Sequence, residues 1–111
     1  MSFTYDGATP VLRNVNFRIE PGSKTAIVGP SGSGKSTVLA LLQRFYDPTS
    51  GRILLGDQDI ADLTPASVRS VVGLVEQEAA VLAGTVRENL RLGSADVDDD
   101  RLWWALDQVN L

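Results

Sequence analysis

Residues 29–37 combine glycines, hydroxyl side chains and one lysine in a pattern that is typical of phosphate binding. The segment has the sequence Gly29-Pro30-Ser31-Gly32-Ser33-Gly34-Lys35-Ser36-Thr37. Glycine has no Cβ, so the backbone can turn tightly and its N–H groups can converge on an anion. The Lys35 ammonium can reach the terminal phosphates of a nucleotide, and the Ser36 hydroxyl can take one coordination position of magnesium. The segment therefore predicts a phosphate-binding loop, or P-loop, for a nucleoside triphosphate with Mg²⁺.

A strand and a helix are needed to hold this loop in place. The apolar run at 25–28 predicts a buried strand that leads directly into Gly29. After the loop, four apolar residues follow at the spacing of one helical face: Val38, Leu41, Leu42 and Phe45. We expect this helix to end near Phe45, because Pro48 disfavours helical geometry at the preceding residue. The first turn of the helix would add unpaired N–H groups and the positive end of its dipole to the phosphate site.

Further strands and helices are predicted on both sides of this unit. The patterns indicate strands at 3–5, 15–19, 52–55 and 71–75, and helices at 65–70, 85–90 and from 98 onward. Thr64 before Pro65, and Thr85 three residues before Glu88, are typical of helix starts. The first two strands should pair antiparallel, whereas the wholly apolar 71–75 is typical of a parallel strand covered on both faces. This order predicts an α/β fold with an antiparallel β subdomain.

Composition narrows the classes of function. The chain has 111 residues, of which 43% are hydrophobic and 22% charged, as expected for one small globular domain. Its net charge of -4 argues against a nucleic-acid surface, which needs clustered Lys and Arg. The absence of cysteine excludes disulfides and cysteine-based zinc sites and fits a cytoplasmic location. The chain also has no histidine, so a mechanism that needs one must obtain it from elsewhere.

Segments beyond the P-loop point to one family. They are FTY at 3–5, VLRNVNFRIEPG at 11–22, AIVGPSGSGKST at 26–37, RFYDPTSGRILL at 44–55, VGLVEQE at 72–78 and GTVRENL at 84–90. Together they resemble the nucleotide-binding domain of ATP-binding cassette (ABC) transporters, and more narrowly those of the exporter type. The resemblance implies a P-loop NTPase core with an antiparallel β subdomain, followed by the start of the ABC helical subdomain. It also implies that residues 1–111 are a partial nucleotide-binding domain.

The resemblance assigns roles that the residue types alone leave open. Taken alone, Tyr5 is more typical of a core residue and Gln77 of a solvated loop. By resemblance, Tyr5 stacks on adenine and Val11 lies beside the base. Gln77 matches the Q-loop glutamine, which helps to ligate Mg²⁺ and orients the attacking water. The expected site thus comprises Tyr5, Val11, residues 29–37 and Gln77, with Lys35 and Gln77 as catalytic residues and Ser36 and Gln77 as Mg²⁺ ligands.

Three parts of the family's hydrolytic apparatus do not occur in the sequence: a Walker B strand ending in Asp-Glu, an LSGGQ signature and a switch histidine. The apolar run 102–106 ends in Asp107 and imitates a Walker B strand, but Gln108 follows it and its spacing is helical. We therefore expect a fragment from the N-terminal part of the domain, which can bind ATP but does not hydrolyse it alone.

By resemblance, the parent protein is a transport ATPase. Two nucleotide-binding domains would pair head to tail, contact the coupling helices of a transmembrane domain at the cytoplasmic face of a membrane, and drive export. Two alternatives remain open. One is a degenerate module that binds ATP without cleaving it, and the other is a soluble ATPase of the same superfamily. The residue after the Walker B aspartate would distinguish the first alternative, since catalysis needs Glu there.

Overall fold

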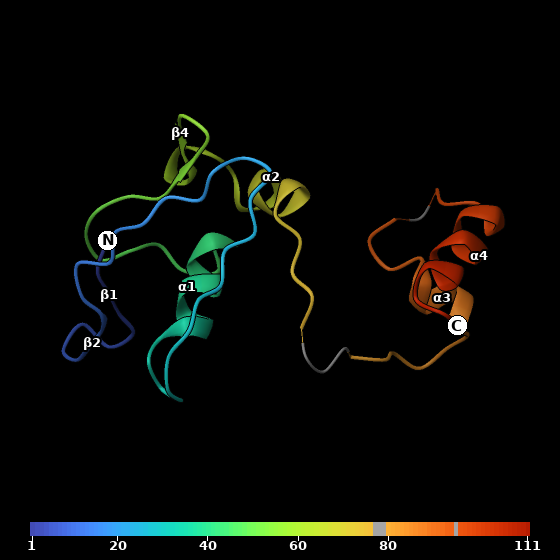
Figure 1. Cartoon of the computed structure of the whole chain (residues 1–111), viewed down its shortest axis with the longest axis horizontal. Coiled ribbons are helices and arrows are strands. Elements are labelled where there is room, and N and C mark those ends of the chain that lie inside the picture. The colour runs from blue at the N-terminus through green and yellow to red at the C-terminus, as the bar shows by residue number, and fades with distance from the viewer. Residues whose placement is uncertain (77–79, 95) are drawn as a thin grey trace. The chain divides into compact units, whose positions relative to one another are not determined.

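The computed structural model describes residues 1–76, 80–94 and 96–111. The chain divides into two compact units, Met1–Leu74 and Val75–Leu111, and each is described by itself. Figure 1 shows the helices and strands of both units along the chain. Among the residues that the structure describes, no helix has the length and apolar character needed to cross a bilayer.

The first unit begins with an antiparallel hairpin of β1 (Phe3–Thr4) and β2 (Pro10–Leu12). Phe3 lies opposite Leu12, and both side chains are buried. In the turn, the Asp6 carboxylate accepts hydrogen bonds from the N–H groups of Thr9 and Ala8, both at 2.9 Å. These bonds hold the pKa of Asp6 below its usual value. The hairpin is thus closed by a local side-chain turn.

The predicted hairpin is confirmed, but the position predicted for its second strand, 15–19, is wrong. Only Val15 pairs, because it exchanges backbone hydrogen bonds with Met1 at 2.7 and 2.8 Å. Phe17 and Ile19 remain exposed. The return strand begins five residues earlier, at Pro10, because the Asp6 turn reverses the chain at once.

Helix α1 (Lys35–Leu42) follows the P-loop, and Gly34 occupies its N-cap position without a side-chain capping bond. With 8 residues, it is shorter than the ~12–15 residues that an isolated helix needs in water. Its stability must therefore come from burial of Val38 and Leu41, which contribute roughly 1.5–3 kcal/mol each. They pack with Phe3 and Leu12 of the hairpin in one apolar cluster.

The end of α1 is a Schellman motif with an unusual residue in it. The Phe45 N–H donates to the Ala40 carbonyl at 2.9 Å, and the Arg44 N–H donates to the Leu41 carbonyl at 3.0 Å. Arg44 occupies the left-handed position, with φ of 55°, where glycine is usual. This conformation costs roughly 1–3 kcal/mol for a residue with a Cβ. The closing hydrogen bonds and an ion pair from Arg44 to Asp47 at 3.1 Å offset that cost.

The rest of the first unit closes the core. A hairpin of β3 (Leu54–Leu55) and β4 (Gln58–Asp59) leads into the short 3₁₀ helix η1 (Ile60–Asp62) and then into α2 (Pro65–Val71). Strand β3 falls inside the predicted strand 52–55. Thr64 caps α2 by accepting from the Ser67 N–H at 3.1 Å, as the sequence predicted. Seven side chains form the core cluster: Phe3, Leu12, Val38, Leu41, Ile53, Ile60 and Val68.

The predictions of strands at 25–28 and 71–75 are wrong. Neither segment joins a β-ladder in the part of the chain that the structure describes, and Val71 closes α2 instead. Val28 is 85% exposed and Val75 is 99% exposed. A parallel strand forms only beside a hydrogen-bonded neighbour, and the described residues place none beside these two segments. The apolar pattern indicates which residues are suited to burial. It does not indicate which other strand would pair with them.

The second unit contains α3 (Val86–Leu90) and α4 (Asp99–Gln108). α3 starts at the predicted cap, Thr85, and α4 starts where the sequence predicted a helix from 98 onward, with Asp98 as its N-cap. Asp99 joins the two helices, because it accepts hydrogen bonds from Arg87 at 2.9 and 3.1 Å and from Arg91 at 3.1 Å. The run 102–107 lies within α4, so the structure agrees with the helical interpretation and not with a Walker B strand.

The start of α3 should be sensitive to acid. The Glu88 carboxylate accepts from the Thr85 N–H at 2.7 Å and from the Thr85 hydroxyl at 2.9 Å, and these bonds lower the pKa of Glu88 from 4.5. Because the folded pKa is depressed, the stabilisation is complete above pH 4.5 and is lost as the pH falls through the folded pKa. Hydrogen exchange at residues 85–91 should accelerate over that range, beyond the intrinsic pH dependence of exchange.

The Glu88→Gln variant is the matched control, because its amide oxygen can accept the same bonds without titrating. Its exchange should lack this acid transition. An equal transition in both proteins, or a Glu88 titration midpoint at or above 4.5, would contradict the assignment.

Candidate functional site

Positive φ values at all three glycines of residues 29–37, with close side-chain contacts at Gly29 and Gly34, favour glycine at these positions. A Cβ on Gly29 would lie 2.7 Å from the Ser33 Oγ, and one on Gly34 would lie 2.6 Å from the Leu12 Cδ2. Gly32 and Gly34 also have positive φ values of 78° and 88°, which side chains with a Cβ rarely adopt. Residues 29–33 are exposed. The loop therefore offers its backbone to solvent on one side and packs against β2 at Gly34.

Lys35 folds back over the loop that precedes it. Its Nζ donates to the carbonyl oxygens of Gly29 and Pro30, both at 2.8 Å, and lies 3.4 Å from the Ser33 Oγ. A lysine ammonium has three protons to donate, so these acceptors can engage all of them. The Lys35 ammonium therefore lies beside loop residues 29–33, where its charge could attract an anion.

The start of α1 adds further donors. No side chain caps this end of the helix, because its N-cap is Gly34, and the first intrahelical bond is donated by the Val38 N–H to the Gly34 carbonyl at 3.0 Å. The N–H groups of the first turn therefore point out of the helix toward the loop. Ser36 is exposed on this turn, whereas Thr37 is buried. Backbone donors, the Lys35 ammonium and the exposed Ser36 hydroxyl thus share a single end of α1.

Tyr5 and Val11 lie beside this helix start. The Tyr5 hydroxyl is 3.1 Å from the Thr37 Oγ1, and 56% of the residue's surface is exposed. The carbonyl oxygen of Val11 is 3.5 Å from the position that a Cβ of Gly34 would take. The structure therefore brings Tyr5, Val11 and the loop together in the first unit. Gln77, predicted for catalysis and Mg²⁺ binding, lies outside the described residues.

The residues at this site fit Mg²⁺ held mainly by a phosphate ligand. In the described parts of the chain, no group of three or more Asp, Glu, His or Cys side chains could hold a metal ion by itself. Mg²⁺ usually keeps several waters and takes only one or two protein ligands when it binds with phosphates. The exposed Ser36 hydroxyl, next in sequence to Lys35, suits that mode.

The sequence did not predict that Tyr46 lies beside Tyr5. Tyr46 contacts Tyr5, with ring centroids 5.2 Å apart, and Phe3 contacts both rings. The sequence offered one signal, since Tyr46 falls in the segment RFYDP directly after the helix of the P-loop. The Schellman motif at Arg44 that brings Tyr46 to Tyr5 was not predictable, because it has no glycine.

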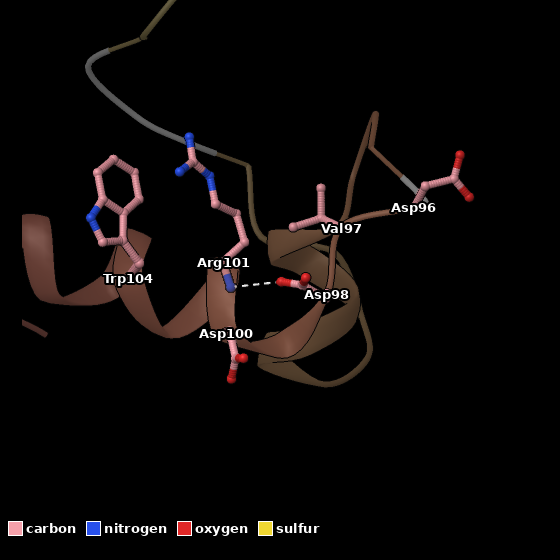
Figure 2. A pocket seen from close by; sticks show the side chains of 6 residues that line it. All are labelled: Asp96, Val97, Asp98, Asp100, Arg101 and Trp104. Carbon is pink, nitrogen blue, oxygen red and sulfur yellow. Dashed lines mark hydrogen bonds between the residues drawn. The ribbon is translucent and has the colours of Figure 1, made fainter.

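Each unit has a concave surface, and residues 29–37 are not among the residues that line either one. A groove of about 890 Å³ in the first unit is lined mainly by residues 15–23 and 52–57. A shallow hollow of about 550 Å³ in the second unit surrounds the start of α4 (Figure 2). There the Arg101 guanidinium covers the Trp104 ring at 4.2 Å, and Asp98 accepts from the Arg101 N–H at 2.9 Å. The hydrogen bond to Asp98 caps the start of α4.

Known proteins similar to the chain are ABC transporters. The mitochondrial iron-sulfur clusters transporter ATM1 of Candida albicans is 46% identical over 111 residues, which are 100% of this chain and 15% of that protein. A multidrug resistance ABC transporter ATP-binding and permease protein of Lactococcus lactis is 44% identical over 108 residues, 96% of this chain and 18% of that protein. The chain thus spans less than a fifth of the length of these relatives.

The fold is similar to that of a solved exporter. A structure of a bacterial Atm1-family ABC exporter with ATP bound matches 96% of this chain and 19% of its own, with a TM-score of 0.90 and 40% sequence identity. The family model for ABC transporters matches residues 12–111. The chain therefore belongs to the ABC transporter family.

Proposed function

We propose that residues 1–111 are the ATP-binding part of the nucleotide-binding domain of an ABC exporter. The observation that supports this most directly is the Lys35 ammonium, held at 2.8 Å from the Gly29 and Pro30 carbonyl oxygens inside a glycine-dependent loop. The similar structure has ATP bound, and residues 29–37 lie within the segment 12–111 that the family model matches. In this proposal the P-loop NTPase core and its antiparallel β subdomain lie in the first unit, and the helical subdomain begins in the second.

In this proposal, different residues of the first unit bind the phosphates and the base of the nucleotide. Lys35 exchanges its loop acceptors for phosphate oxygens, so that the ammonium bonds to charged oxygens in place of neutral carbonyl oxygens. The N–H groups of the loop and of the first turn of α1 bind the remaining phosphate oxygens. The exposed face of Tyr5 stacks on the base, with Val11 beside it.

Magnesium, when bound with the nucleotide, neutralises part of the phosphate charge that develops during transfer to water. Ser36 and Gln77 are the proposed protein ligands. Gln77 would also hold the attacking water, and Lys35 would stabilise charge on the transferred phosphate. The sequence contains no histidine and no LSGGQ segment, so hydrolysis requires groups from outside residues 1–111.

The expected setting follows from the family. The intact protein would pair this domain head to tail with a second nucleotide-binding domain and contact a transmembrane domain through its coupling helices. The ATP sites would lie at the cytoplasmic face of a membrane, and closure of the pair would drive export. The relatives named for multidrug resistance and for iron-sulfur clusters show that the substrate varies among proteins that share this domain.

Removing the Lys35 ammonium should weaken ATP binding. We expect Lys35→Ala in the intact protein to lower Mg-ATP affinity by roughly 10- to 100-fold, because charge-assisted bonds to phosphate are lost. Titration calorimetry measures this directly. Lys24→Ala, which removes an exposed lysine outside the loop, should bind as the wild type does. Near-wild-type affinity and ATPase activity of Lys35→Ala would refute the assignment of the loop.

The role of Gln77 predicts a different pattern. Gln77→Ala should lower the rate of transport-coupled ATP hydrolysis by at least about tenfold, because it removes a group that acts on the attacking water. It should change Mg-ATP affinity much less. Gln108→Ala, which removes a glutamine at the end of α4, provides the control. If Gln77→Ala lost affinity as much as turnover, its proposed role would be wrong.

A further inference from the structure

Tyr5 contacts one residue from the first turn of α1 and one from beyond the end of that helix. Its hydroxyl is 3.1 Å from the Oγ1 of Thr37, in the first turn of the helix. Its ring meets the ring of Tyr46, beyond the end of the helix, at 5.2 Å and 88°. Phe3 meets the Tyr5 ring at 4.8 Å and 85° from within the core. Three contacts therefore restrict the orientation of one exposed ring.

Tyr46 contributes to this arrangement without being a core residue. It is 47% exposed, and its ring is also 5.6 Å from that of Phe3. Its position follows from the Schellman motif, in which Arg44 reverses the chain at the end of α1 and is held by Asp47. The left-handed backbone of Arg44 is strained, and this strained turn brings the Tyr46 ring into contact with Tyr5.

We propose that Tyr46 is a positioning residue for the base of the bound nucleotide. Edge-to-face contact with Tyr46 and Phe3 fixes the plane of the Tyr5 ring, and the Thr37 hydroxyl fixes its tip. The exposed face of Tyr5 is then already oriented when a base arrives, so that less side-chain freedom is lost on binding. This inference rests on the proposed ATP-binding function, in which Tyr5 stacks on the base.

The test separates binding of the base from binding of the phosphates. Affinities of the intact protein are measured for Mg-ATP and for Mg-tripolyphosphate, which has no base. Tyr46→Ala should weaken Mg-ATP binding about three- to tenfold, the worth of one aromatic pair, and leave tripolyphosphate affinity unchanged. Tyr46→Phe should bind ATP as the wild type does, since the contact is made by the ring.

Two further variants sharpen the result. Phe45→Ala is the matched control, because Phe45 is the adjacent aromatic, is similarly exposed at 55%, and contacts Arg69 at 5.1 Å. It should leave ATP affinity unchanged. The double variant Tyr5→Ala with Tyr46→Ala should bind ATP no more weakly than Tyr5→Ala alone, because Tyr46 acts through Tyr5.

The inference is overturned if Tyr46→Ala binds ATP like the wild type, if it loses tripolyphosphate affinity equally, or if its effect adds to that of Tyr5→Ala. Failure of the proposed function is distinguishable. In that case the wild-type protein would bind neither ligand, or Lys35→Ala would bind both as well as the wild type does.

Discussion

Packing of α1 against the β1–β2 hairpin is the interaction on which the other features of the site depend. The helix is too short to be stable alone, and burial of Val38 and Leu41 with Phe3 and Leu12 holds it in place. Once held, its first turn presents the P-loop and Thr37, and its last turn leads to Tyr46. This packing therefore holds the proposed phosphate donors at one end of the helix and Tyr46, which contacts Tyr5, at the other.

The fold was predictable wherever the signal was local. The predicted caps at Thr64 and Thr85, and the helix start predicted at 98, were correct because a capping side chain and the N–H group it binds lie within three residues of each other. The strands predicted at 25–28 and 71–75 were wrong because strand formation depends on a partner distant in sequence. Their apolar residues are suited to burial. Val28 and Val75 are nevertheless exposed, so an apolar sequence alone does not produce a β-ladder.

The same distinction applies to the site. The glycines and Lys35 were identified because the residue pattern of a P-loop is local in the sequence. The contacts that a Cβ would make with Ser33 at Gly29, and with Leu12 of β2 at Gly34, fit glycine at both positions. Tyr46 was missed because its contact with Tyr5 spans 41 positions, and Arg44 adopts a conformation that sequence patterns assign to glycine. The hydrogen bond between Tyr5 and Thr37 was equally unpredictable, since each residue type commonly serves other roles.

The Lys35 ammonium, which would bind phosphate, donates hydrogen bonds to the Gly29 and Pro30 carbonyl oxygens. Binding of phosphate by Lys35 would therefore replace its bonds to the loop. An experimental structure of the intact protein with Mg-ATP tests this replacement most directly. The phosphates should lie against the N–H groups of the loop and the first turn of α1, with the Lys35 Nζ transferred from the carbonyl oxygens to phosphate oxygens. A nucleotide bound elsewhere, with Lys35 still bonded to Gly29 and Pro30, would contradict the proposed site.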